Sequence, residues 1–188
     1  MATTSIFGGI VVLAVIITIV WAIGVYNRLI SLRNLKEEGW SGIDVQLKRR
    51  HDLIDNLVNT VKGYMQHERG VLEDVTRMRA SAQQAGGVAA VSVAEAGLSQ
   101  AVGRLFAVME NYPALKASEN ALQLQESLSS LENDIQMARR YYNGTVRDLN
   151  ILIQSFPSNI VARHYSFKEG DYFELDNIAE RALPKVSL

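Results

Sequence analysis

The most distinct pattern along the chain is an apolar run close to its start. Residues 6–26 read IFGGIVVLAVIITIVWAIGVY, 21 positions without a charged side chain. As a helix, this run spans about 32 Å, which matches a membrane hydrocarbon core of about 30 Å. Trp21 and Tyr26 lie near its end, where aromatic side chains favour the membrane interface. The run therefore predicts a transmembrane helix over residues 6–26 that contacts membrane lipid.

The residues that flank this run predict how the chain is oriented. No Lys or Arg precedes it, whereas Arg28, Arg33 and Lys36 follow closely, and basic side chains accumulate on the cytoplasmic side of membrane helices. A cleaved signal peptide would carry a basic residue before the run and a small-residue cleavage site after it, and the sequence has neither. We therefore expect a retained span, with residues 1–5 as a short exported tail and the bulk of the chain in the cytoplasm.

Beyond the span, apolar residues recur at alternating steps of three and four, a spacing typical of helices that pack together. This spacing predicts a long helix over residues 40–84, and the Gly86–Gly87 pair supplies a break after it. Two charged residues interrupt the apolar stripe. The stripe consists of Ile43, Leu47, Arg50, Ile54, Leu57, Val61, Tyr64, Glu68, Val71, Val75 and Met78.

Two further long helices are expected. The first covers residues 92–112 and is stopped by Pro113. The second covers residues 118–156, with Ser118 as its N-cap and an acidic residue in its first turn. The stripe of this second helix consists of Ala121, Leu124, Leu128, Leu131, Ile135, Ala138, Tyr142, Thr145, Leu149, Leu152 and Phe156.

The C-terminal part, residues 158–188, is expected to form short elements. SNIVARHY (158–165) predicts two helical turns, SFKEGDYFEL predicts a turn and an extended segment, and NIAERAL (177–183) predicts a last short helix. Phe156 and Ile160 are expected to cap the core. The aromatic residues expected to dock this tail onto the end of the bundle are Phe167, Tyr172 and Phe173.

Long helices joined by short breaks must bury their stripes against each other, and an antiparallel bundle does this most simply. The predicted fold class is all-α: an N-terminal transmembrane helix followed by an elongated antiparallel bundle. The bundle has three long helices and one or two short C-terminal ones, and residues 27–188 form its single soluble domain.

Composition excludes several classes of function. Nineteen basic and 20 acidic side chains give 188 residues a formal net charge of −1, which argues against a nucleic-acid partner because such proteins carry a basic surface. The chain has no cysteine, so it can form no disulfide, no thiolate metal site and no cysteine nucleophile.

No group of residues predicts catalysis, a cofactor or a metal. The three histidines, His51, His67 and His164, form neither a Glu-x-x-His pair of a bundle di-metal site nor a zinc-protease helix. Gly86–Gly87 lacks the lysine of a phosphate-binding loop. Adjacent carboxylates such as Glu37–Glu38 diverge by about 100° on a helix and cannot work as a catalytic pair. We therefore expect a protein that is not an enzyme, with no catalytic, cofactor-binding or metal-binding residues.

The basic cluster Lys48–Arg49–Arg50 permits two interpretations. These side chains fan around the helix, so that one of them, Arg50, falls at a stripe position. A partly buried, paired Arg50 that fixes the helix register is the structural interpretation. Contact with a protein partner or with anionic lipid is the functional one.

Several stretches, in this order, carry a family resemblance. They are YNRLISLRN, IDVQLKRRHDLIDNLVNTVKGYMQHE, VTRMRA, RLFAVMENYPALKASENALQLQESL, ARRYYN, IQSFPSNIVARHYSF and DYFEL. Over residues 6–188 the sequence resembles the LemA family of bacterial membrane-anchored helical proteins. The resemblance implies a single-pass protein of the bacterial inner membrane, with an exported N-terminus and a cytoplasmic helical bundle. It implies no reaction.

Three functions are compatible with these patterns. The first is a non-enzymatic membrane-anchored scaffold that forms homo-oligomers, since tethering to one membrane raises the effective concentration of like chains. The second is an adaptor or accessory factor for another membrane protein, such as a protease or a transporter. The third is a small-molecule sensor whose pocket would draw on Arg50, Glu68 and Tyr142.

Overall fold

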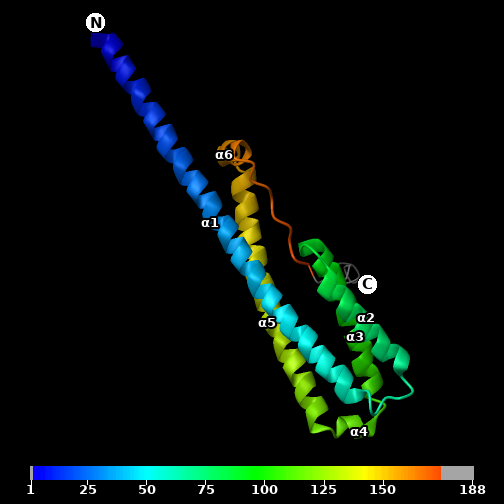
Figure 1. Ribbon diagram of the computed structural model, residues 1–188. Coiled ribbons are helices and arrows are strands. Elements are labelled where there is room, and N and C mark those ends of the chain that lie inside the picture. The colour runs from blue at the N-terminus through cyan, green and yellow to red at the C-terminus, as the bar shows by residue number, and fades with distance from the viewer. Residues whose placement is uncertain (1, 175–188) are drawn as a thin grey trace, which may run out of the picture. The chain divides into compact units, whose positions relative to one another are not determined.

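The computed structural model describes residues 2–174, and the regular elements of that part of the chain are all α-helices (Figure 1). The predicted all-helical fold class is therefore confirmed. In chain order the helices are α1 (Ala2–Val61), α2 (Arg69–Gln84), α3 (Val88–Met109), α4 (Pro113–Lys116), α5 (Glu119–Gln154) and α6 (Ser158–His164).

The chain divides into two compact units. Within the described residues, the first unit comprises 2–40 and 141–170, and the second unit comprises 41–140 and 171–174. Helices α1 and α5 each contribute residues to both units, whereas α2, α3 and α4 belong to the second unit and α6 to the first.

Helix α1 runs without a break to Val61, so the predicted span and the following helical residues form one element. The prediction of a single helix over 40–84 is wrong at residues 62–68, where the chain turns before α2. Gly63 weakens the helix at this point, and the N–H groups of Tyr64 and Met65 both donate to the Val61 carbonyl. Because the helix ends there, Tyr64 is 50% exposed and Met65 takes its place in the core.

Helices α2 and α3 form an antiparallel pair. Arg104 near the end of α3 bonds to Asp74 near the start of α2. Gly87 joins the two helices with φ of 81°, a left-handed backbone that residues with a side chain rarely adopt. The predicted break at the glycine pair is confirmed, while α3 begins and ends a few residues earlier than the predicted range 92–112.

The predicted stripe of α5 is buried along almost its whole length. Its first ten members, from Ala121 to Leu152, are buried or half-buried. The Ser118 hydroxyl accepts a hydrogen bond from the Ala121 N–H at 3.5 Å, as expected of the residue that caps this helix. The regular three–four spacing therefore identifies the packed face of a helix correctly.

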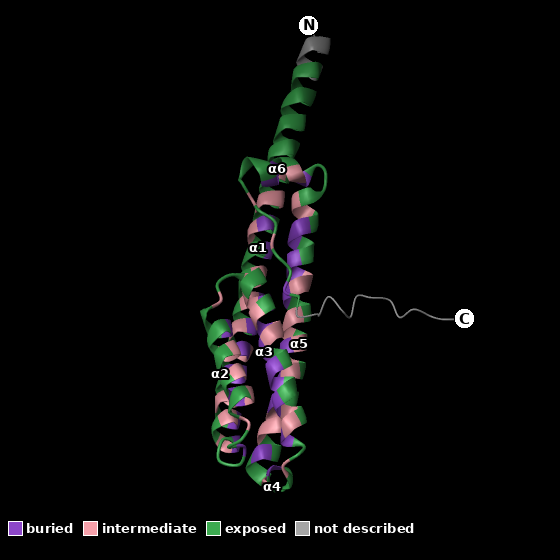
Figure 2. Ribbon diagram, turned by 90° about the vertical axis from the view of Figure 1, so that its right-hand side faces the viewer, coloured by how far each residue is buried: buried purple, intermediate pink, exposed green. Residues whose placement is uncertain are grey.

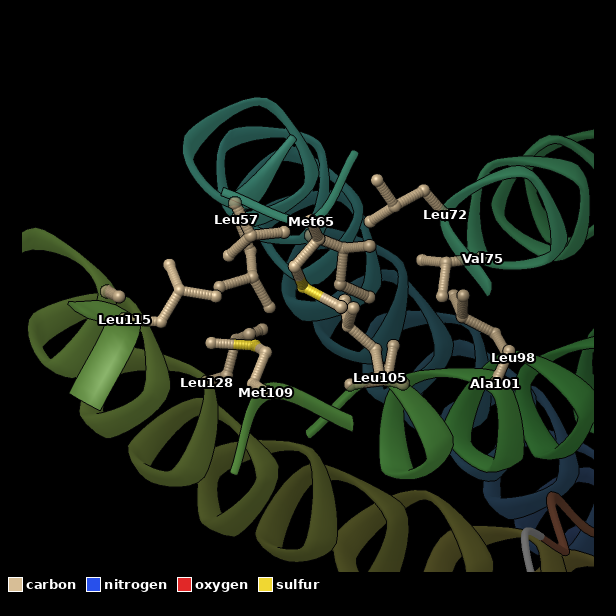
Figure 3. Close-up of a cluster of buried hydrophobic side chains, with 14 of the residues drawn as sticks. Leu57, Met65, Leu72, Val75, Leu98, Ala101, Leu105, Met109, Leu115 and Leu128 are labelled. Atoms are coloured by element: carbon tan, nitrogen blue, oxygen red, sulfur yellow. The ribbon is translucent and has the colours of Figure 1, made fainter. Parts of the chain in front are cut away.

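The core of the second unit is a large hydrophobic cluster built from α1, α2, α3, α4 and α5 (Figure 3). Leu57 and Met65 meet Leu105 and Met109 of α3 in this cluster, and Leu128 of α5 packs beside them. Phe173 is also fully buried in this unit, and the Ser92 hydroxyl donates to the carbonyl of Glu174. Docking of the C-terminal segment is thus confirmed for Phe173, whereas the prediction is wrong for Tyr172, which is 44% exposed.

The first unit has a smaller core. Leu29 and Leu32 of α1, Leu149 of α5, and Val161 and Ala162 of α6 are its buried residues. Ala22, Val25, Tyr26 and Phe167 pack against them. Helix α6 therefore lies against the last turns of the predicted span.

Two contacts complete the first unit. Gly39 of α1 approaches α5 so closely that a Cβ atom there would lie 3.2 Å from Cα of Tyr142. The Asn150 amide nitrogen donates to the Gly170 carbonyl at 3.0 Å, and the Gly170 N–H donates to the Asn150 amide oxygen at 2.8 Å. This two-way bond holds the extended segment after α6 against α5.

One prediction about the C-terminal part is wrong, and another lies outside the described residues. Phe156 and Ile160 do not cap the core, because Phe156 is 81% exposed and Ile160 is 60% exposed. Pro157 ends α5 and turns the chain, so that Val161 and Ala162 face the core instead. The predicted helix over 177–183 lies outside the described residues.

Candidate functional site

The N-terminal part of α1 is exposed in the first unit (Figure 2), and most of its side chains there are apolar. Its large apolar side chains from Phe7 to Ile23 are between 38% and 70% exposed. The hydroxyl of Thr18 donates to the Ala14 carbonyl at 2.9 Å and so needs no water partner. In the described part of the chain, α1 is the helix whose length and composition suit a membrane crossing. A water-exposed patch of this size is rare in soluble proteins, which makes the segment a candidate membrane contact.

A second candidate is a buried polar cluster in the second unit. Glu95 on α3 is completely buried. Its two carboxylate oxygens contact different partners on α1. Arg50 Nη1 donates to Glu95 Oε2 at 3.0 Å, and His51 Nε2 lies 2.6 Å from Glu95 Oε1. Arg50 Nη2 also donates to the Ser99 hydroxyl at 2.7 Å and lies 3.6 Å from a carboxylate oxygen of Glu132 on α5. The cluster thus joins three helices.

The geometry of this cluster favours a structural role. Both oxygens of Glu95 are occupied, and the side chain has no exposed surface that a reactant could reach. A buried ion pair of this kind helps to define which helix faces meet, because any other register leaves a charge unpaired. The structural interpretation of Arg50 is therefore confirmed, and its contacts leave no exposed guanidinium for a partner.

The structure separates the other residues considered from sequence. Glu68 does not join Arg50, and its carboxylate instead accepts a bond from the Tyr112 hydroxyl at 3.4 Å. Glu95 was missed by the sequence interpretation. Glu95 lies three residues before Leu98, at the next position of the apolar stripe toward the N-terminus of α3. This spacing was the feature of the sequence that could have predicted its burial.

The histidines do not converge. His51 belongs to the buried cluster, while His67 and His164 are exposed. Within residues 2–174, no three His, Asp or Glu side chains are placed to hold a metal ion together.

Charged groups at the α2–α3 surface shift two pKa values. The Arg104 guanidinium bonds to Asp74 and holds the pKa of that carboxyl below its ordinary value of 3.8, with Arg77 adding to the effect against partial desolvation. Desolvation raises the pKa of Tyr112, and the nearby Glu68 carboxylate raises it further. Neither shift brings a group near neutral pH, so neither marks a general acid or base.

A surface groove of about 410 Å³ lies between α1 and α5 in the second unit. Its walls are mostly polar, and each of its two leucines belongs to a helix whose apolar face is already packed. The lining residues are Arg49, Asp52, Leu53, Ser127, Ser130, Leu131 and Asp134. Ligand pockets are commonly concave and mainly apolar, and this groove lacks that character.

These features define a class: a helical-bundle protein whose N-terminal helix is apolar, exposed and suited to a membrane. Comparison with known families agrees, because the model of the LemA family matches residues 39–188. The chain belongs to the LemA family.

Curated relatives carry two names. The chain is 26% identical over 189 aligned residues to Magnetosome protein MamQ 2 of Paramagnetospirillum magneticum, an alignment that covers 87% of this chain and 70% of the relative. It is 27% identical over 158 aligned residues to Protein LemA of Metamycoplasma hominis, covering 83% of this chain and 72% of that relative. It is 23% identical to Magnetosome protein MamQ of Magnetospirillum gryphiswaldense, covering 79% of this chain and 64% of that relative.

Proposed function

We propose that this protein is a non-enzymatic membrane anchor and scaffold whose helical bundle acts through protein–protein contact, with self-association at the membrane as its principal mode. The exposed apolar surface from Phe7 to Ile23 carries this proposal. A helix with such a surface is stable when lipid covers it, since every backbone polar group is bonded within the helix. The fully paired buried charges of the second unit give no sign of a reaction centre.

The proposed orientation places residues 1–5 outside the bacterial inner membrane and residues 27–188 in the cytoplasm. Arg28 and Arg33 follow the apolar segment directly. The fold adds support, because α6 packs beside Val25 and Tyr26 and so brings Arg163 to the same end of the segment. Basic residues at one end of a span favour the cytoplasmic side for that end.

Self-association is favoured over an adaptor role by the effect of tethering. Chains anchored at one height meet in two dimensions, which raises their effective concentration without any new contact. Within the described residues, the large apolar side chains exposed on the second unit are scattered over several helices, as on many soluble surfaces.

The particle mass of the full-length protein after gentle extraction into nanodiscs or mild detergent tests this proposal. We expect a defined oligomer that withstands dilution. Residues 28–188, measured in parallel, show whether association needs the apolar segment. Monomers in both samples at high concentration would remove self-association and leave the adaptor role, for which crosslinking in cells identifies the partner.

A matched pair of variants tests the anchor itself. Ile16→Arg places a charge in the middle of the apolar segment, where it costs about 2.5–3.5 kcal/mol in a membrane. Val93→Arg places the same charge on an exposed site of α3. We expect alkaline washing of membranes to release much more Ile16→Arg than wild type, and to leave Val93→Arg bound. Equal release of all three proteins would contradict the anchor.

A further inference from the structure

Large apolar side chains are exposed on and around α6, including the segment that links it to α5. Phe156 is 81% exposed, Ile160 is 60% exposed and Tyr165 is 56% exposed. Val161 and Ala162 of the same short helix are buried against α1 and α5. Helix α6 therefore packs through Val161 and Ala162, while Ile160 on the helix and the residues Phe156 and Tyr165 that flank it are exposed.

The position of α6 within the first unit says what can cover this second side. Its buried residues pack in one cluster with Ala22, Val25 and Tyr26, the last turns of the apolar segment. The Tyr165 ring lies 4.6 Å from the Tyr26 ring, centroid to centroid. The part of α1 that precedes Ala22 continues beyond α6 with its apolar side chains exposed (Figure 2). If that part crosses the membrane, α6 lies at the level of the lipid headgroups.

The basic residues around α6 are consistent with a position at the lipid headgroups. Residues 1–36 and 149–168 contain no Asp or Glu. The same two stretches contain Arg28, Arg33, Lys36, Arg163 and Lys168. Acidic residues border both stretches, because Arg33 lies 4.0 Å from the Glu37 carboxylate and Glu169 follows Lys168 directly. Basic side chains near the membrane are attracted to anionic headgroups. The first unit thus combines exposed apolar residues with basic residues near the end of the apolar segment, the two features of a segment that lies in the membrane interface.

We propose that α6 is an interfacial membrane contact: Phe156 and Ile160 insert into the boundary between headgroups and acyl chains of the leaflet from which α1 emerges, and Arg163 and Lys168 contact anionic headgroups. This inference rests on the proposed anchor, because it takes the level of the membrane from the apolar segment. The contact gives the protein a second attachment, which fixes the depth and the tilt of α1 where it leaves the bilayer. The occupant of the surface is lipid.

The absence of cysteine allows a direct test on the full chain. Four single-cysteine variants, each at an exposed site, carry an environment-sensitive fluorophore: Phe156→Cys, Ile160→Cys, Val93→Cys and Ile16→Cys. Each protein is reconstituted into vesicles of phosphatidylcholine and phosphatidylglycerol, with or without lipids that carry a nitroxide quencher at shallow or deep positions. Circular dichroism confirms that each labelled protein keeps the helical content of wild type.

Position 16 reports the anchor, and position 93 reports a comparably exposed apolar site in the second unit. We expect the label at 156 and at 160 to emit at shorter wavelength than the label at 93 and to be quenched most by the shallow nitroxide. Such quenching corresponds to a depth of about 5–10 Å below the headgroup surface. The label at 16 is expected to be quenched most by the deep nitroxide, and the label at 93 by neither.

The other outcomes separate the two proposals. If the label at 16 is quenched but those at 156 and 160 behave like the label at 93, the interfacial contact is wrong and the anchor stands. If no label is quenched, the anchor fails and the inference fails with it. If the labels at 156 and 160 shift to shorter wavelength without quenching, and the shift depends on the protein-to-lipid ratio, a second copy of the chain covers this surface and the lipid contact is wrong.

Discussion

The two units use apolar residues in different ways. The second unit gathers fifteen buried residues in one cluster and pairs the buried Arg50 with Glu95, whose other carboxylate oxygen contacts His51. The first unit has a cluster of five buried residues, while apolar side chains along α1 and around α6 remain exposed. The buried residues of the second unit therefore find their partners within that unit. The first unit presents surface that water does not favour, and we expect its stability to depend on the lipid that surrounds it.

The buried charges of the second unit give the largest expected effect. In Arg50→Met, the Glu95 carboxylate loses its arginine partner and keeps only His51 while it stays buried, and removal of one partner from such a pair costs about 3–5 kcal/mol. The free energy of unfolding, measured in mild detergent by urea titration and helical circular dichroism, checks this. The double variant Arg50→Met/Glu95→Leu is the control and should recover much of the loss. If the two substitutions together cost as much as the sum of the single ones, the pair does not act as a unit.

The next effect compares the two cores. Leu105→Ala in the second unit and Leu149→Ala in the first both remove a fully buried side chain, a change that costs about 2–5 kcal/mol. We expect Leu105→Ala to lie near the upper end of this range, because the larger cluster around it cannot collapse into the cavity. Leu149→Ala should lie near the lower end. The same urea titration checks both variants, and an equal or larger loss for Leu149→Ala would show that the small core is the tighter one.

A pair of glycines in α1 tests how closely the helices approach. Gly39→Ala in the first unit forces a Cβ against the Tyr142 backbone, and overpacking of this kind costs about 1–3 kcal/mol. Gly42→Ala in the second unit meets no atom within 4 Å and should gain about 0.5–1 kcal/mol from better helix propensity. Thermal unfolding should move in opposite directions for the two variants. A gain in both would mean that α5 can shift away from Gly39 at little cost.

The smallest effect comes from the surface charges of α2 and α3. The pKa of Asp74 is lower in the folded protein than its ordinary value of 3.8, so its ionised form stabilises the fold. This contribution is complete above that value and is lost as pH falls through the lower, folded pKa. Asp74→Asn should therefore lower the thermal midpoint slightly at neutral pH and show no deficit once wild type has also lost the charge. Glu73→Gln, which removes a charge from the exposed neighbouring residue and leaves Asp74 in place, is the control.

Helical spacing predicted much of the fold and failed for a physical reason at two residues. The stripe of α5 holds from Ala121 to Leu152 because period and packing agree along a continuous helix. At Phe156 the spacing continues, but Pro157 ends the helix and turns the chain before the side chain meets a partner. At Tyr64 the same three–four spacing runs through a turn, where it no longer describes one helical face.

The candidate site was predictable in part. The position of Arg50 within an apolar stripe made a buried, paired side chain one of its two interpretations, and the structure confirms that one. Its partner Glu95 is 45 residues away in a stretch of small side chains, and helical spacing alone cannot match charges on different helices. The exposure of Phe156 could not be predicted from the sequence either. An apolar stripe shows which face of a helix packs, but it does not show where the helix that packs against this face ends.

The two-way bond between Asn150 and Gly170 has a consequence for how the protein opens locally. One amide side chain satisfies both backbone groups of Gly170, as a neighbouring strand would. Gly170 is also the last residue of the first unit, and the chain enters the second unit at Asp171. Detachment of the segment from Asp171 to Glu174 can therefore stop at this bond while α6 keeps its contacts. We therefore expect the Gly170 amide to mark a border between two local opening reactions, each with its own rate of exchange with solvent.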